Sequence, residues 1–240
     1  MNMKDIVLIP TYNEKENIKL IIAEIFNFLP DIKILVIDDN SPDGTAAAVK
    51  FLMEKYPNLS LLERRRKTGL GDAYKEAIRK VVKDKEIRSV ITMDADGSHS
   101  PKYLKSFLDN IGQYDLVVGS RYVVGGGVSA WNFWRRTLSK LGNLYVRTLV
   151  GLNINDLTAG FICARREMLE KIDFDNIDSS GYAYQIEFKC YCLYDLGAKI
   201  KELPIIFESR RGGESKISNQ IISEGILAPW RILLKRLWKK

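Results

Sequence analysis

The sequence has one histidine, His99, and three cysteines, Cys163, Cys190 and Cys192, in 240 residues. A single histidine excludes any site that needs a histidine pair or a histidine-rich metal cage. An odd number of cysteines without Cys-x-x-Cys spacing argues against disulfides and zinc, so we expect buried, reduced thiols. The apolar runs fall short of the roughly 18 residues that a transmembrane helix needs, so we expect no membrane span.

Acidic residues are missing from two stretches, residues 131–150 and 229–240, in a chain of net charge +7. The same two stretches hold nine positive charges and all four tryptophans. In the second stretch, helical periodicity places the Leu and Trp side chains on one half and most Arg and Lys side chains on the other. Two interpretations stay open: a helix that lies on an anionic membrane surface, or one docked on its own domain with a solvated basic face.

A basic run at residues 64–67 raises nucleic acid as a third type of partner. No aromatic platform or recognition motif accompanies this run, so we expect no nucleic-acid partner. The chain enters a strand-like run within its first ten residues, without the pattern of a signal peptide. We therefore expect a cytoplasmic protein, peripheral on the cytoplasmic face of the membrane if the basic helices bind there.

Strand-like and helical segments alternate in the first half of the chain. The β-rich apolar runs are residues 4–9, 33–37, 59–62, 88–93 and 116–118. Near-continuous Val, Ile and Leu in such runs predict a mostly parallel sheet covered on both faces, a doubly wound α/β domain. After a glycine triplet the pattern changes, and it predicts helices at 131–150 and 182–196, strands at 161–164 and 200–207, and an amphipathic C-terminal helix. We expect one domain over residues 1–217 and a basic amphipathic helix over 218–240.

Acidic residues follow three of the predicted strands: Glu14, Asp38, Asp39, Asp94 and Asp96. Because ligands bind at the carboxyl ends of parallel strands, we expect these carboxylates to meet at one edge. Such crowding needs neutralisation, and an Asp-x-Asp turn suits Mg²⁺ or Mn²⁺ that also binds ligand phosphates. A lone Asp-x-Asp is more often a capped turn, and Asp38 and Asp43 also suit turn and cap positions. Three such turns at one edge favour the metal site.

Several catalytic motifs are missing. The first strand is followed by Pro-Thr-Tyr-Asn-Glu, where a dinucleotide-binding domain has Gly-x-Gly-x-x-Gly. The sequence contains neither a Walker A motif nor a nucleophile elbow. These absences argue against a dehydrogenase, a P-loop kinase and a serine hydrolase.

Seven segments together are typical of one family. They are Pro-Thr-Tyr-Asn-Glu (10–14), Asp-Asp-Asn-Ser-Pro-Asp-Gly-Thr (38–45), Gly-Leu-Gly-Asp-Ala-Tyr (69–74), Asp-Ala-Asp-Gly-Ser-His (94–99), Gly-Ser-Arg-Tyr (119–122), Asp-Leu-Thr-Ala-Gly-Phe (156–161) and Gly-Glu-Ser-Lys (213–216). In this order they resemble the family 2 inverting glycosyltransferases, over about residues 6 to 222. The resemblance implies a glycosyltransferase with the GT-A fold. It is strongest to those members that move mannose from GDP-mannose to dolichyl or polyprenyl phosphate for glycosylation.

The resemblance also implies roles for individual residues. Residues expected to bind the nucleotide sugar are Pro10, Tyr12, Glu14, Ile37, Asp39, Asp94, Ala95, Asp96, Arg121, Arg210 and Lys216. The catalytic residues among them are Asp94, Asp96 and Arg121. The expected Mg²⁺ or Mn²⁺ ligands are Asp96 and Ser98, although Ser98 stands where some relatives have a longer glutamine.

The implied reaction needs no catalytic histidine. A phosphate acceptor is already anionic at neutral pH, so a base has little to remove, and cations neutralise the leaving diphosphate. We expect Arg135 and Arg136, beside Trp131 and Trp134, to hold the acceptor phosphate. Two alternatives stay open: glucose transfer from UDP-glucose to polyprenyl phosphate or transfer to another acceptor, and a nucleotide-sugar-binding protein without turnover.

Overall fold

The computed structural model describes residues 3–129, 131–212 and 219–238, with the backbone alone over 219–224. A seven-stranded sheet crosses this part of the chain in the order β3-β2-β1-β4-β7-β5-β8. The strands are β1 (Lys4–Thr11), β2 (Lys33–Asp38), β3 (Leu59–Glu63), β4 (Ile87–Thr92), β5 (Leu116–Ser120), β7 (Ile162–Arg165) and β8 (Ile200–Pro204). β7 is antiparallel to β4 and β5, and every other neighbouring pair is parallel. The predicted mostly parallel α/β sheet is confirmed.

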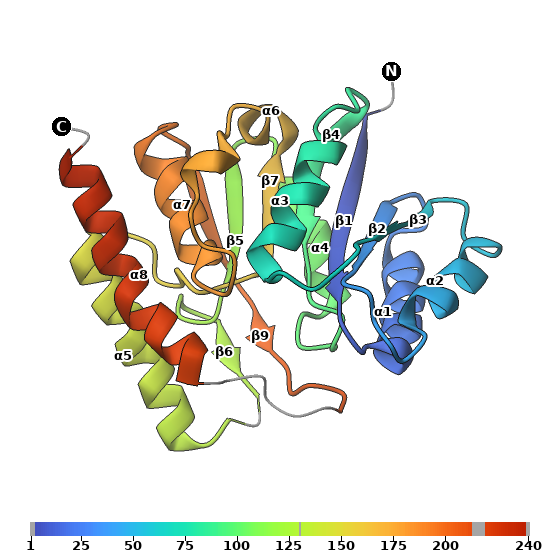
Figure 1. The fold of residues 1–240 in the computed structure, drawn as a ribbon, viewed down its shortest axis with the longest axis horizontal. Coiled ribbons are helices and arrows are strands. Elements are labelled where there is room, and N and C mark those ends of the chain that lie inside the picture. The colour runs from blue at the N-terminus through green and yellow to red at the C-terminus, as the bar shows by residue number, and fades with distance from the viewer. Residues whose placement is uncertain (1–2, 130, 213–218, 239–240) are drawn as a thin grey trace.

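Helices cover both faces of the sheet, because successive residues of each strand point to opposite sides. In β1, Ile6 and Leu8 point into one apolar cluster, whereas Val7 and Ile9 point into the other. The first cluster lies under α3 (Leu70–Val81), α6 (Arg166–Leu169) and α7 (Tyr184–Tyr194). The second lies under α1 (Lys15–Phe28), α2 (Thr45–Met53) and α4 (Leu104–Asn110), the last preceded by a 3-10 turn at Pro101–Tyr103. These layers are visible in Figure 1.

Two long helices extend the domain at the end opposite β3. α5 (Phe133–Val150) and α8 (Asn219–Trp238) lie side by side there (Figure 1). A third apolar cluster joins Val146 and Val150 of α5, Ile186 of α7 and Ile232 of α8. The predicted strand at 200–207 is divided, because β9 (Ile206–Phe207) leaves the main sheet and pairs with β6 (Gly127–Val128). A 3-10 turn spans Phe174–Asn176.

The Gly-Leu-Gly segment at the start of α3 makes a close backbone contact. The N–H of Gly71 donates to the carbonyl of Ser180 at 2.7 Å. A Cβ on Gly69, whose φ is +131°, would lie 2.3 Å from that carbonyl oxygen, and a Cβ on Gly71 would lie 2.7 Å from Tyr184 Cβ. These glycines therefore let α3 approach the segment before α7, and that segment borders the site described below.

The three cysteines are buried and unbonded to one another, as the sequence predicts. Burial raises the pKa of the Cys163 thiol to about 12, so it stays protonated at neutral pH. Within the described ranges, no helix combines the length and the apolar character that crossing a bilayer requires.

Candidate active site

The turns after β1 and β2 are held together by Asp38. Its carboxylate accepts the Thr11 hydroxyl at 3.0 Å, the Ser41 N–H at 2.9 Å and the Ser41 hydroxyl at 2.6 Å. Asn40, two residues on, has a φ of 58°, in the left-handed region that asparagine tolerates. Asp38 is almost fully buried. Asp38 therefore lies at the edge of the sheet where the carboxylates were expected to meet. Its hydrogen bonds show that it stabilises the turn, which is the second role that the sequence suggested.

Asp39 points the other way and pairs with Arg64. The guanidinium lies 2.5 Å from the Asp39 carboxylate, and it also bonds to Glu76 and Thr68. Burial raises the pKa of Asp39 and outweighs the opposing effect of Arg64. The first member of the basic run at 64–67 therefore neutralises an internal acid instead of a surface polyanion.

Lys67 from the same run lies over the ring of Tyr12, with Nζ 3.9 Å from its centroid. Tyr12 and Asp39, both expected to hold a nucleotide, thus lie near cationic side chains at the ends of β1 and β2. Ile37 and Ala95 differ from this pattern, since both side chains are packed in the core. Any ligand contact from these two residues must come from their backbone.

The Asp94–Ala95–Asp96 turn follows β4, and His99 shapes it. The Asp94 N–H donates to His99 Nδ1 at 3.0 Å, which makes that nitrogen an acceptor. The imidazole is stacked on Phe161, with ring centroids 4.8 Å apart, and burial lowers its pKa. His99 is therefore neutral at pH 7. Burial raises the pKa of Asp94, and the nearby Asp96 and Glu14 charges add to this effect.

Asp96 is buried and bound to an internal cation. Its Oδ2 lies 2.9 Å from Nε of Arg210, while its Oδ1 accepts the N–H of Ser98 at 3.0 Å and the Ser98 hydroxyl at 2.6 Å. The backbone of Asp96 also accepts the N–H of Arg211. The segment after β9 therefore lies along the Asp-x-Asp turn, and Arg210 places a positive charge on its second carboxylate.

This arrangement suits a divalent cation that takes part of its ligands from a phosphate. Asp96 already binds a cation, and Mg²⁺ sites commonly combine one or two carboxylates with substrate oxygens. No group of three or more His, Cys, Asp or Glu side chains that could hold a metal occurs in the part of the chain that the structure describes. The Ser98 hydroxyl donates its proton to Asp96 and is fully buried, so in this arrangement it orients the carboxylate.

A second charged pair joins the end of β5 to the loop before β7. Arg121 donates through Nε and Nη2 to both oxygens of Asp156, at 2.7 and 2.6 Å, and its N–H bonds to the same carboxylate. Burial by itself raises the pKa of Asp156, but Arg121 outweighs burial and holds that pKa below its usual value. The rings of Trp131 and Phe207 lie 5.7 and 5.6 Å from the guanidinium carbon.

Three residues that the sequence analysis missed hold the 156–160 loop. The side-chain Oδ1 of Asn143 accepts the N–H of Leu157 at 2.9 Å, and the Glu202 carboxylate accepts the N–H of Asp156 at 3.0 Å. The buried Lys189 donates to the carbonyls of Leu157 and Ala159, and burial lowers its pKa to about 8. The sequence offers one sign of a buried Lys189, which is its place between the apolar residues Phe188 and Cys190. A buried lysine needs partners, because lysine is rarely buried without them.

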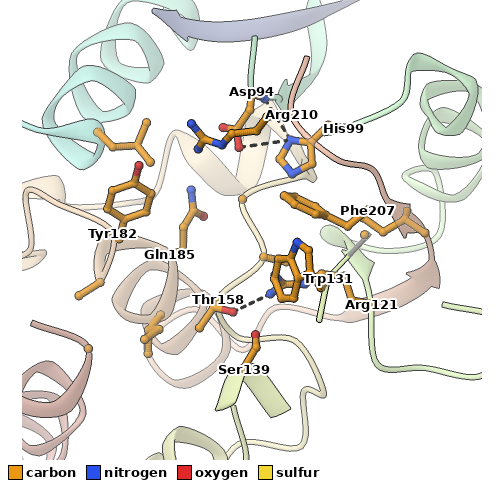
Figure 2. A pocket seen from close by; sticks show the side chains of 18 of the residues that line it. Asp94, His99, Arg121, Trp131, Ser139, Thr158, Tyr182, Gln185, Phe207 and Arg210 are labelled. Atoms are coloured by element: carbon orange, nitrogen blue, oxygen red, sulfur yellow. Dashed lines mark hydrogen bonds and ion pairs between the residues drawn. The ribbon is translucent and has the colours of Figure 1, made fainter. Parts of the chain in front are cut away.

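These elements enclose a cavity of about 340 Å³. Figure 2 shows Asp94, Arg210 and His99 at one end and Trp131, Ser139 and Thr158 at the other, with Gln185 between them. The cavity thus joins an acidic and cationic end, near the Asp-x-Asp turn, to an aromatic and cationic end at α5. Such a shape suits an elongated ligand with phosphate at both ends.

The two arginines at the start of α5 take different positions. Arg135 lines the cavity and lies over Trp131, with its guanidinium carbon 4.5 Å from the ring centroid. Arg136 does not line the cavity, and its Nη2 donates to the carbonyl of Val128 at 3.1 Å. Of the remaining expected residues, Pro10 is half-buried at the end of β1 and Glu14 accepts a bond from Asn17. Lys216 lies outside the described residues.

One exposed face of α5 and α8 is rich in apolar side chains, and Arg135, Arg136 and Lys140 of α5 are exposed as well. We call this face the apolar ridge: Phe133, Trp134, Leu138, Leu141 and Leu144 of α5 with Ile226, Leu227, Trp230, Leu234, Leu237 and Trp238 of α8. Each of these side chains is at least 49% exposed. The basic residues of α8 point the other way, onto the domain: Arg231 bonds to Ser179, Lys235 to Asn176, and Arg236 to Val150. Helix α8 is therefore docked on its own domain, with Arg231 still about half exposed, and membrane contact by its apolar face stays a prediction.

Comparisons with known proteins agree with the motifs. The family model described as glycosyl transferase family 2 matches residues 6–173. The chain is 42% identical over 237 residues to polyprenol monophosphomannose synthase of Mycolicibacterium smegmatis, with 95% of this chain and 87% of that protein covered. It is 38% identical over 237 residues to undecaprenyl-phosphate mannosyltransferase of Micrococcus luteus, with 99% and 97% covered.

A solved structure with the same fold is glucosyl-3-phosphoglycerate synthase from Mycobacterium tuberculosis, crystallised with Mn²⁺, uridine diphosphate and phosphoglyceric acid. It superposes with a TM-score of 0.70 at 17% identity, over 98% of this chain and 78% of that chain. A second crystal structure of that enzyme, with Mg²⁺ and uridine diphosphate, gives a TM-score of 0.69. The similarity confirms the predicted GT-A fold.

The Arg121–Asp156 pair predicts a test of stability. Asp156→Asn leaves a buried guanidinium without its counter-charge, so we expect the free energy of unfolding to fall by about 3 kcal/mol at pH 7. Because the pKa of Asp156 is lowered in the folded protein, its stabilisation is complete at neutral pH and is lost progressively as the pH falls below about 4 and through the folded-state pKa. Urea unfolding at pH 7 and at lower pH measures both effects.

The matched control is Asp109→Asn, which breaks an exposed pair with Lys105 on the surface of α4. We expect it to change the free energy of unfolding by less than about 0.5 kcal/mol. Equal losses in the two variants would contradict a structural role for the Arg121–Asp156 pair.

Proposed function

Since the chain belongs to glycosyl transferase family 2 and is a glycosyltransferase, we propose that it moves mannose from GDP-mannose to a polyprenyl phosphate. The observation that supports this proposal most directly is that one cavity joins the Asp94–Arg210 end to the Trp131–Arg135 end. A donor diphosphate suits the first end, and an acceptor phosphate suits the second. The names of the two curated relatives support mannose as the sugar.

At the donor end, the chain's own residues bind and orient the nucleotide. Tyr12 and Asp39 contact the base and ribose from the ends of β1 and β2. Asp96, with Asp94 beside it, would hold Mg²⁺ or Mn²⁺, and the metal when bound would neutralise the leaving diphosphate. A metal at this site would compete with Arg210 for the Asp96 carboxylate. The Arg210 side chain, 29% exposed in the ion pair, would then be available to bind the diphosphate.

The acceptor phosphate attacks the anomeric carbon from the face opposite the leaving diphosphate, so the configuration inverts. A phosphate monoester is anionic at neutral pH, so no general base has to remove a proton. His99 fits this scheme as a neutral structural residue, because its Nδ1 accepts the Asp94 N–H. Arg121 stays paired with Asp156, and the pair fixes the 156–160 loop at the acceptor end.

The apolar ridge supports a peripheral position on a membrane, which we propose is the cytoplasmic face. Its exposed Leu and Trp side chains suit the boundary between headgroups and acyl chains, and the exposed Arg135 and Lys140 flank its α5 part. The ridge begins beside the acceptor end of the cavity, because Trp131 and Arg135 belong to that end. In this scheme residues 1–217 form the catalytic domain, and residues 218–240 complete the membrane surface.

The direct test is a transfer assay. Purified protein with Mg²⁺ or Mn²⁺ and a short polyprenyl phosphate receives radiolabelled GDP-mannose or, in parallel, UDP-glucose. We expect label in the lipid phase from GDP-mannose and none after chelation of the metal. Transfer from UDP-glucose instead would replace the sugar and keep the mechanism, whereas nucleotide binding without any transfer would contradict the proposal.

The two arginines of α5 form a matched pair. Arg135→Ala removes a cation from the cavity, so we expect kcat/KM for the polyprenyl phosphate to fall by about 100-fold, as for loss of a charged contact. Arg136→Ala removes a contact with a backbone carbonyl outside the cavity, so we expect less than about a fivefold change. Binding of GDP-mannose, measured by calorimetry, should change in neither variant. Equal effects of the two substitutions on acceptor use would rule out Arg135 as the phosphate ligand.

A vesicle assay tests the apolar ridge. Leu234→Glu with Trp238→Glu places two charges on exposed positions of α8, so we expect binding to anionic vesicles to weaken by at least about tenfold. The matched control is Phe51→Glu, which charges a side chain that is 71% exposed on α2, away from the ridge. Sedimentation with vesicles reports binding, and circular dichroism checks the fold. If both proteins sediment like the wild type, the ridge does not bind the membrane.

A further inference from the structure

The Gln185 side chain is a buried amide without a hydrogen-bond partner. Gln185 is 2% exposed, and neither its Nε2 nor its Oε1 forms a hydrogen bond with any atom in the described part of the chain. Figure 2 shows the amide pointing into the cavity, between the side chains of Tyr182 and His99. A buried amide normally finds partners, because an unmatched donor or acceptor destabilises the fold.

The backbone holds Gln185 firmly in this position. Its N–H donates to the carbonyl of Tyr182 at 3.3 Å, and its own carbonyl accepts Nζ of Lys189 at 3.2 Å. Across from the amide, a Cβ on Gly160 would lie 3.4 Å from Nε2. With glycine at residue 160, no side chain from that position packs on the amide, and Gln185 lines the cavity there.

The chemistry of an amide selects among the parts of a nucleotide sugar. A neutral group with two N–H donors and one acceptor oxygen suits hydroxyl groups, which both donate and accept, better than a phosphate. Gln185 lies between the Asp94–Arg210 end and the Trp131–Arg135 end of the cavity. In a transfer between two phosphates, the transferred sugar lies between them.

We infer that the Gln185 amide hydrogen-bonds hydroxyl groups of the transferred hexose and helps to select the sugar, an inference that rests on the function proposed above. The bound sugar would provide the partners that the folded chain lacks. A sugar without the matching hydroxyl would leave the amide buried and unpaired, which is how such sites reject an analogue.

The first test is Gln185→Met, which keeps the length of the side chain and removes its polar atoms. Because the amide has no partner in the protein, we expect the melting temperature to stay the same or to rise. We expect GDP binding to change by less than twofold, whereas affinity for GDP-mannose and kcat/KM fall by about 10- to 100-fold. The control is Gln113→Met, the same change on an exposed residue, which should leave all four quantities unchanged.

A lower melting temperature, together with an equal loss of affinity for GDP and for GDP-mannose, would overturn the inference. Such a result would indicate that Gln185 has a packing role. Unchanged affinity for GDP-mannose would also overturn it. Calorimetry with GDP and GDP-mannose needs no turnover. If wild-type protein transfers no sugar, the proposed function fails, and the binding comparison still decides the role of Gln185.

The second test identifies the hydroxyl. GDP-mannose analogues that each lack one sugar hydroxyl are compared between wild type and Gln185→Met. We expect at least one analogue to bind the wild type about tenfold or more weakly than GDP-mannose, and to bind the variant almost as well as GDP-mannose does. If every analogue lost the same affinity, relative to GDP-mannose, in the wild type and in Gln185→Met, then Gln185 contacts none of these hydroxyls.

Discussion

Negative charge gathered at one edge of a parallel sheet is the constraint on which this site depends. The strand ends bring Asp38, Asp39, Asp94 and Asp96 together, and each is stabilised differently. Asp38 accepts N–H and hydroxyl donors, Asp39 pairs with Arg64, and Asp96 pairs with Arg210. The Asp94 carboxylate lies 3.8 Å from Nδ1 of the neutral His99, and burial raises its pKa. The two acids nearest the cavity are thus the ones whose charge balance a bound metal and diphosphate would change most.

The other end of the cavity depends on a pair that needs no ligand. Arg121 and Asp156 are neutralised within the fold, and Asn143, Glu202 and Lys189 fix the loop that carries Asp156. One end of the site is therefore neutralised within the fold, while the other pairs Asp96 with Arg210, the cation that a metal would replace in the proposed function. This difference suits a reaction in which the donor arrives with a metal and the acceptor arrives as a bare anion.

The strand pattern and the acidic turns could be predicted from the sequence because both are local. Val- and Ile-rich runs predict strands, and strand ends converge at one edge in any parallel sheet. Periodicity also shows which side chains of α8 share a face, but it does not tell which face the domain covers. Ile232, which falls on the basic half, is the residue that packs inward. The partners of Lys189 and the unpaired amide of Gln185 could not be predicted, because they depend on which distant segments the fold brings together.

The antiparallel strand β7 has a consequence for where the chain can be altered. Ile162 pairs with Thr92 and Arg165 with Ser89, so β7 begins at the edge that carries the cavity and ends at the opposite edge. For this strand the preceding loop contributes to the site, and the following segment, with exposed Glu170 and Lys171, lies at the far edge (Figure 1). A fluorophore or an epitope inserted there would report on the molecule without obstructing substrates.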